Sequence, residues 1–197
     1  GWADREFLAV GASMRNRGRR VEEFVAVLRA LWEDDVVDHH GEFYQVPQMR
    51  LAPKLLPRPP ILLGGMAPAA LRRAGRIADG WISGSQADLK RIGESIATVK
   101  AAAEAAGRDP GSLRFVARGA VRVRPPGTPN RQLLTGTPDQ IRADFDDLAA
   151  QGVTELFLDL NFDPEIGSPD ADPTASVRRA EEVLEACAPG AVTDSSN

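Results

Sequence analysis

Several features that would point to particular classes of protein are missing from the sequence. Its 197 residues include a single cysteine, Cys187, so no disulfide can form within this chain. Apolar runs such as Ile61-Leu62-Leu63 are far shorter than the roughly 20 residues that a membrane-spanning helix needs. The 24 basic and 28 acidic residues leave a net charge of −4, so no broad positive field favours nucleic acid or anionic lipid. We therefore expect a globular, cytoplasmic protein that binds neither nucleic acid nor membrane.

A helix and a hairpin are expected in the first third of the chain. Between Ser13 and Trp32, apolar residues recur at steps of three and four, which lays one stripe along a helix. The first turns of this helix carry four arginines, at positions 15, 17, 19 and 20. Cations oppose the macrodipole at a helix N-terminus, so the cluster is either a solvated helix face or a clamp for an anion. Residues 34–57 hold two short strand-like runs and a proline-rich stretch, which predict a hairpin excursion.

From Pro59 onward, short apolar strands alternate with helices. Strands are predicted at residues 60–63, 80–83, 113–123 and 155–160. The helices between them begin near Pro68, Asp88 and Thr137, and a last helix is predicted over 175–186. The run Thr137-Pro138-Asp139-Gln140 has the residues of a capping box.

Strands that alternate with helices predict an α/β fold with parallel pairing and right-handed crossovers. Two architectures remain open at this point. A doubly wound sheet would bind ligands where the strand order reverses, whereas a barrel would bind them at the carboxyl ends of its strands. Four strand–helix repeats correspond to half of an eight-stranded barrel.

The turn Leu63-Gly64-Gly65-Met66-Ala67-Pro68 joins a predicted strand to a predicted helix. Free backbone N–H groups and the helix dipole would suit a phosphate there, and glycine lets the backbone approach it closely. Glycine is also used in such turns merely for its conformation. The sequence contains no Gly-x-Gly-x-x-Gly fingerprint and no Gly-Lys-Ser/Thr phosphate loop, so a standard dinucleotide or P-loop site is unsupported.

Other candidate chemistry is sparse. His39 and His40 are adjacent, so on a strand they point to opposite faces, and we assign no metal site. No serine occupies a nucleophile elbow, and Cys187 lies at the end of the predicted last helix. Three polar residues, Arg118, Asp159 and Asn161, lie at the carboxyl ends of predicted strands. In a barrel they would line the substrate pocket; the alternative is that they are solvated or paired structural charges.

A series of short motifs resembles bacterial luciferase-like flavin and deazaflavin oxidoreductases, a family of monooxygenases and related enzymes. The motifs occur in the order typical of that family and extend to about residue 160. They are Gly1-Trp2, Glu6-Phe7, Arg17-Gly18-Arg19-Arg20 with Glu22-Glu23, Leu31-Trp32, Gly41-Glu42-Phe43-Tyr44, Pro59-Pro60-Ile61, Gly64-Gly65, Ala78-Asp79-Gly80-Trp81, Gly136-Thr137-Pro138 and Gly152-Val153-Thr154.

The resemblance implies a (β/α)8 TIM barrel that binds coenzyme F420 or FMN at the carboxyl ends of its strands. The chain would supply the second half, strands 5 to 8, and because it opens with Gly1 we expect a fragment. Residues 1–162 would form the partial barrel domain with an insertion hairpin at 34–57, and residues 163–197 a C-terminal helix and a disordered tail. The implied cofactor-binding residues are Trp2, Arg19, Gly64, Gly65, Met66 and Ala67.

The sequence differs from the family pattern in two ways that affect the expected site. Relatives often carry a hydroxyl residue where Ala67 stands, so phosphate binding here would depend on backbone donors. Catalytic groups come partly from the other half of the barrel, so no catalytic residue is assigned. We expect an F420- or FMN-dependent oxidoreductase or monooxygenase acting on a small organic substrate, in a homo-oligomer or with a missing N-terminal half. The alternative is a non-catalytic half barrel that binds an anion or self-associates.

Overall fold

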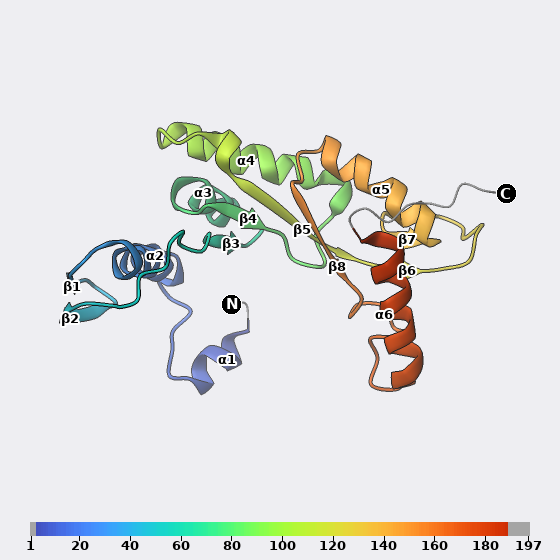
Figure 1. The fold of residues 1–197 in the computed structure, drawn as a ribbon, viewed down its shortest axis with the longest axis horizontal. Coiled ribbons are helices and arrows are strands. Elements are labelled where there is room, and N and C mark those ends of the chain that lie inside the picture. Colours follow the sequence, from blue (N-terminus) through green and yellow to red (C-terminus); the bar gives the residue numbers. More distant parts are fainter. Residues whose placement is uncertain (1–2, 189–197) are drawn as a thin grey trace.

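The N-terminal part of the chain contains two helices and a hairpin (Figure 1). The computed structural model describes residues 3–188. Helix α2 begins at Arg17, later than the sequence predicts, because Asn16 adopts a left-handed conformation with φ of 58°. Arg15 therefore precedes the helix, and the arginines of its first turn are Arg17, Arg19 and Arg20. The elements of this part are α1 (Asp4–Ala9), α2 (Arg17–Glu33), β1 (Val37–His40) and β2 (Gln45–Met49).

Four parallel strands form the central sheet in the order β3-β4-β5-β8. Their bounds are β3 (Leu62–Gly64), β4 (Gly80–Ile82), β5 (Arg114–Ala120) and β8 (Glu155–Asp159). Each strand pairs with the preceding strand of this sheet, so the strand order never reverses. The predicted parallel α/β arrangement is confirmed.

The helices that connect these strands lie on one side of the sheet. Figure 1 shows α3, α4 and α5 on the same side, with α6 beyond the last strand. Sequential strand order with helices on one face is the arrangement in a barrel wall, whereas a doubly wound sheet carries helices on both faces. The chain thus forms a partial (β/α) barrel. The helices are α3 (Pro68–Ile77), α4 (Ile92–Ala105) after a short 3-10 turn (Leu89–Arg91), α5 (Pro138–Ala150) and α6 (Pro173–Cys187).

Alternate residues of the strands divide the sheet into a covered face and an open face. Trp81 and Phe115 occupy equivalent positions on β4 and β5 and are buried against the helices. Phe157 on β8 points to the opposite face, beside Arg118, and 54% of it is exposed. In a complete barrel this second face is the interior. The described part of the chain leaves it open.

The third predicted strand, 113–123, is interrupted in the structure. β5 ends at Ala120, and Arg122–Val123 form a separate strand, β6, that pairs with β7 (Thr135–Gly136). The N–H of Val121 donates to the carbonyl of Asp159 at 2.9 Å, which ends the pairing with β8. The chain then leaves the sheet and builds a small second layer above its carboxyl edge.

The predicted capping box at the start of α5 is confirmed. The N–H of Gln140 donates to the Thr137 hydroxyl at 3.3 Å, and the Gln140 side chain accepts from the N–H of Thr137 at 3.0 Å. We expect Thr137→Ala to lower the free energy of unfolding by about 1 kcal/mol, because it removes one partner of an otherwise free N–H. Urea unfolding followed by circular dichroism measures the difference. Thr137→Ser keeps the hydroxyl and is expected to match the wild type.

Asp79 joins three segments at the amino-terminal edge of the sheet. Its carboxylate accepts from Arg58 at 2.7 and 3.0 Å, from Arg29 at 3.3 Å and from the N–H of Ile61 at 2.8 Å. Burial alone would raise the pKa of Asp79, but the hydrogen bonds from Arg58 and Ile61, with the charges of both arginines, lower it to about 2. Asp79 therefore fixes the entry to β3 and the turn before β4.

The low pKa of Asp79 predicts part of the acid sensitivity of the fold. The carboxylate stabilises the folded state at pH values above its ordinary pKa of 3.8, and this contribution is lost as the pH falls toward about 2. Because the side chain is partly exposed, we expect a contribution of about 1–2 kcal/mol. Chemical unfolding of the wild type and Asp79→Asn at pH 6 and pH 2.5 should show their difference in stability shrinking at the lower pH. A constant difference would contradict this assignment.

Candidate functional site

The turn between β3 and α3 lies at the carboxyl edge of the sheet. Gly65 has φ of +122°, and a Cβ atom there would lie 2.7 Å from the Cβ of Ala70. Glycine is therefore required on both conformational and steric grounds. The indole N–H of Trp81 donates to the Gly65 carbonyl at 2.9 Å and holds the turn against β4.

The start of α3 beyond this turn has unused hydrogen-bond donors. Ala67 is the N-cap residue and offers no side-chain acceptor, and Pro68 has no N–H. The N–H groups of Met66 and Ala67 have no hydrogen-bond partner within residues 3–188. Gly64, Gly65, Met66 and Ala67 are all exposed. An exposed, uncapped helix start with free N–H groups is suited to an anion.

The other two residues of the predicted cofactor set lie elsewhere. Trp2 is outside the described residues. Arg19 lies on α2, is 65% exposed in its side chain and pairs with Glu42 at the tip of the hairpin. Its guanidinium also lies 5.9 Å from the ring centroid of Phe43. An anion at Arg19 would therefore compete with Glu42.

Glu23 fixes the hairpin tip to α2. Its carboxylate accepts from the N–H groups of Phe43 and Tyr44, at 3.0 and 2.8 Å, and lies 3.1 Å from Nε2 of His39. Burial would raise the pKa of Glu23, but these contacts lower it below its ordinary value. Each His of the pair contacts a different side chain, since His40 lies 2.9 Å from Gln45.

The predicted pocket residues Arg118, Asp159 and Asn161 come together at the carboxyl ends of β5 and β8. Asp159 is fully buried, and one of its oxygens accepts from Arg118 at 2.7 Å and from the Ser85 hydroxyl at 2.6 Å. The other oxygen accepts from the N–H and the side-chain amide of Asn161, at 3.1 and 2.9 Å. All four bonds favour the carboxylate form.

The electrostatics of this group follow from its burial. Desolvation would raise the pKa of Asp159, but the hydrogen bonds from Ser85, Asn161 and Arg118 outweigh it, so the pKa is lowered. The guanidinium of Arg118 lies 5.5 Å from the ring centroid of Phe157 on the open face. Asp159 thus remains charged at neutral pH and holds Arg118 in place, which makes it a positioning group and a poor proton donor.

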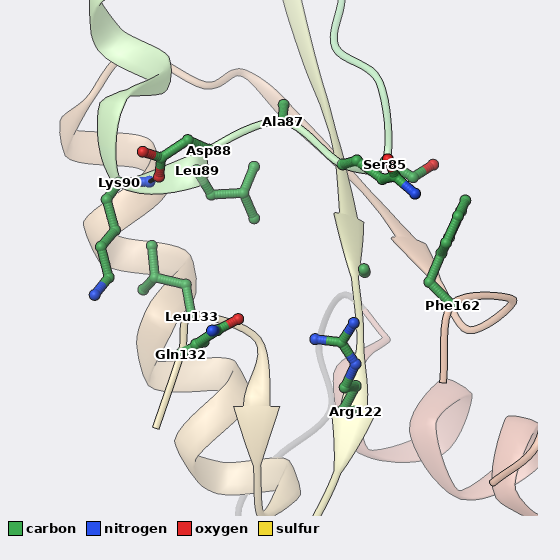
Figure 2. Close-up of a pocket in the computed structure, with 11 residues that line it drawn as sticks. Ser85, Ala87, Asp88, Leu89, Lys90, Arg122, Gln132, Leu133 and Phe162 are labelled. Carbon is green, nitrogen blue, oxygen red and sulfur yellow. Dashed lines mark hydrogen bonds between the residues drawn. The ribbon is translucent and has the colours of Figure 1, made fainter. Parts of the chain in front are cut away.

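A cavity of about 480 Å³ lies beside this group, between the β4–α4 connection and the β6–β7 layer. Figure 2 shows the guanidinium of Arg122 and the amide of Gln132 pointing toward each other from opposite walls, with Leu89 and Leu133 on the side of Gln132. Ser85 belongs both to this cavity and to the Asp159 group. Gly64–Ala67 are not among the residues that line it; the lining residues are Ser85, Gln86, Ala87, Asp88, Leu89, Lys90, Ala120, Arg122, Gln132, Leu133 and Phe162.

Sequence reasoning missed Ser85, Arg122 and Gln132. Ser85 follows the end of β4 by three residues, and that position was the only signal available for it. Arg122 was assigned to a continuous third strand, where its side chain has no special place. In the structure Arg122 lies two residues after Ala120, and both line the cavity.

Residues 3–188 contain neither a cluster of metal ligands nor a membrane-spanning helix. No group of three or more His, Cys, Asp or Glu side chains within residues 3–188 is arranged to hold a metal ion. None of the helices in that range has the length and hydropathy needed to cross a bilayer.

Comparison with known proteins gives a consistent result. The chain is 35% identical over 112 residues to an FMNH2-dependent dimethylsulfone monooxygenase of Pseudomonas putida, a match that covers 54% of this chain and 31% of the relative. It is 32% identical over 99 residues to an F420-dependent hydroxymycolic acid dehydrogenase of Mycobacterium tuberculosis, covering 50% and 27%. The chain therefore matches about a third of the length of these relatives or less.

A solved structure and a family model extend the comparison. The fold matches that of an F420-dependent secondary alcohol dehydrogenase in complex with an F420-acetone adduct, with a TM-score of 0.68 and 18% identity, over 89% of this chain and 63% of that one. At this identity the likeness concerns the fold alone, which is that of a luciferase-like TIM barrel. The model of the luciferase-like monooxygenase family matches residues 1–126. The chain belongs to the luciferase-like monooxygenase family.

Proposed function

We propose that the chain is part of an F420- or FMN-dependent oxidoreductase that transfers a hydride to, or oxygenates, a small organic substrate. Family membership and the FMNH2- and F420-dependent relatives support this assignment. When bound, the cofactor supplies the redox chemistry, while the protein binds it, orients it and excludes water. A barrel binds its ligands at the carboxyl ends of its strands, which is the edge of the sheet where the Gly64–Ala67 turn lies. We place this enzyme in the cytoplasm as part of the same proposal.

The observation that carries the proposal is the turn at Gly64–Ala67. Its exposed N–H groups and the uncapped start of α3 fit the phosphate of either cofactor, and the glycines leave the approach free of side chains. Arg19 would add a positive charge and Trp2 a backbone contact. The assignments of Arg19 and Trp2 come from the resemblance of the sequence to the family. The turn itself is the first target for experiment.

In this proposal Arg118, Asp159 and Asn161, at the carboxyl ends of β5 and β8, line the substrate pocket. Asp159 accepts hydrogen bonds from Arg118 and Asn161, and so fixes the donors that they present to the open face. Because Asp159 is buried and charged, its own contribution is to position Arg118. No residue of the chain is assigned as the catalytic acid or base.

The open face also requires a covering partner. An exposed phenylalanine, Phe157, and the strand edges are costly in water when left uncovered. We propose that residues 1–162 form a partial barrel domain with the hairpin of 34–57 as an insertion, closed by further barrel strands or by a second copy of the chain. Size-exclusion chromatography with light scattering distinguishes a monomer from a self-associated form.

The cofactor proposal is tested with a matched pair of variants at Ala67. Ala67→Ser and Ala67→Asp both supply an N-cap acceptor, so both should fold at least as stably as the wild type. Only the aspartate repels a phosphate. In titrations of FMN and F420 followed by fluorescence, we expect Ala67→Ser to bind like the wild type and Ala67→Asp to bind at least about tenfold more weakly. No response of the wild type to either cofactor would leave the non-catalytic, anion-binding half barrel as the better account.

Arg19 gives a second prediction with its own control. We expect Arg19→Ala to weaken cofactor binding several-fold, and more so at low ionic strength, because an exposed charge is screened by salt. Glu42→Gln, which removes the competing carboxylate, should strengthen binding. Arg15→Ala removes a neighbouring exposed charge outside the proposed site and should change affinity little. Equal affinities for Arg19→Ala and Arg15→Ala would remove Arg19 from the site.

A further inference from the structure

Arg122 differs from the other arginines near the carboxyl edge of the sheet. Arg118 pairs with Asp159 at 2.7 Å and Arg124 with Asp163 at 2.7 Å. By contrast, the guanidinium of Arg122 makes no hydrogen bond or ion pair within residues 3–188. It is half-buried and points into the cavity of about 480 Å³. A guanidinium with five unused donors in a cavity is a binding group for an acceptor from outside the chain.

Three charged residues line the cavity, the cations Arg122 and Lys90 and the anion Asp88. Asp163 attracts Arg122 but is already held by Arg124 through two hydrogen bonds, at 2.9 and 2.7 Å. Asp88 is exposed and accepts from the N–H of Lys90 at 3.0 Å. Figure 2 shows the Lys90 side chain extending away from Arg122 along the far wall. The cavity therefore presents one unneutralised guanidinium, with the Gln132 amide facing it.

The cavity also has an apolar part to its lining, made by Ala87, Leu89, Ala120, Leu133 and Phe162, beside the polar residues Ser85, Gln86, Asp88 and Lys90. Figure 2 shows Leu89 and Leu133 on one side of the cavity and Phe162 on the other. Pockets for small molecules commonly combine such a surface with a few placed polar groups. The volume of about 480 Å³ is large enough for a ligand with a ring or a short chain.

We infer that the substrate of this protein is an organic monocarboxylate with an apolar body, its carboxylate bound by Arg122 and Gln132 and its body packed on Leu89, Leu133 and Phe162. A single guanidinium fork matches one planar carboxylate and one negative charge, whereas a phosphate monoester would bring close to two charges. The inference rests on the proposed function, because it names the substrate of the proposed oxidoreductase.

The place of the cavity supports a substrate role. Ser85 lines it and donates to Asp159, so one residue joins the cavity to the group that ends β5 and β8. The Gly64–Ala67 turn ends the neighbouring strand β3 at the same edge of the sheet. A ligand held by its carboxylate at Arg122 would extend its apolar body toward the face on which the proposed cofactor lies.

The test compares 4-phenylbutanoate with its uncharged analogue 4-phenylbutanamide on the full chain, by 1H–15N NMR titration without cofactor. We expect the carboxylate to bind at least about tenfold more tightly, with shifts at residues 85–90, Ala120 and Leu133. Arg122→Gln should abolish this preference and Arg122→Lys should restore part of it. Arg72→Gln removes an equal charge from the outer surface of α3 and should leave the preference unchanged.

Several outcomes would overturn the inference. They are equal binding of acid and amide, an unchanged preference in Arg122→Gln, shifts confined to other parts of the chain, or tighter binding of phenyl phosphate than of the carboxylate. Circular dichroism of each variant separates loss of binding from loss of the fold. The FMN and F420 titrations are independent of these measurements, so cofactor binding without a carboxylate preference would refute the substrate class alone. A carboxylate preference without cofactor binding would refute the oxidoreductase alone.

Discussion

Replacing Trp81 with alanine is expected to lower the free energy of unfolding by about 3–5 kcal/mol, the largest effect of any single substitution considered. Trp81 is fully buried between β4 and the helices, at the centre of a cluster that includes Phe115, Leu71 and Val99. Alanine would leave a cavity the size of an indole, and close-packed neighbours fill such a space only in part. Urea unfolding followed by far-ultraviolet circular dichroism measures the change.

A second variant separates the packing of Trp81 from its hydrogen bond. Trp81→Phe keeps an aromatic ring but leaves the Gly65 carbonyl without the indole N–H that donates to it at 2.9 Å. We expect a smaller loss, about 1–2 kcal/mol, together with weaker cofactor binding at the Gly64–Ala67 turn. Stability of Trp81→Ala within 1 kcal/mol of the wild type would show that the ring is not a main support of the core.

Asp159→Ala is expected to lower the free energy of unfolding by about 3 kcal/mol. The substitution removes the acceptor of four hydrogen bonds and leaves the partly buried guanidinium of Arg118 without its carboxylate. The loss exceeds that of an ordinary surface pair because Asp159 is fully buried. Thermal and urea unfolding of the variant at pH 7 measure it.

Glu155→Ala provides the control on the same strand. Glu155 pairs with Arg114, but both side chains are exposed, so a much smaller loss is expected. The lowered pKa of Asp159 gives a further check. Its stabilising charge is present above its ordinary pKa and lost as the pH falls below it, so the difference between wild type and Asp159→Asn should shrink in acid. Equal losses for Asp159→Ala and Glu155→Ala would contradict the role given to burial.

Much of the fold could be predicted because its signals are local. Each core strand is a short apolar run that ends in glycine, proline or polar residues, and the helices start at recognisable caps. Pro68 begins α3 and Thr137 caps α5 as expected. Strand–helix alternation then implied parallel pairing. The local pattern is shared by a barrel and a doubly wound sheet; the resemblance implied the barrel, and the observed strand order confirms it.

The parts that were missed depend on contacts between distant residues. Ser85 and Asp159 are 74 positions apart, and Arg58 and Asp79 are 21 apart, so no local pattern connects them. The strand that follows Ala120 pairs with Thr135 and Gly136 instead of β8, a partner that no local pattern indicates. The short helix α1 has no buried residue and left no apolar stripe to detect. The glycines of the Gly64–Ala67 turn and the resemblance to a family both pointed to that turn, but neither indicated the unpaired guanidinium of Arg122.

The sequential order of the strands has a consequence for how the chain acquires its structure. Leu62 pairs with Gly80, Gly80 with Arg114 and Val116 with Glu155, so each new strand joins the one made just before it. Loop closure is less costly over such short separations than across a whole domain. During synthesis on the ribosome, the sheet can therefore grow one strand at a time, because each new strand pairs with a strand that has already formed.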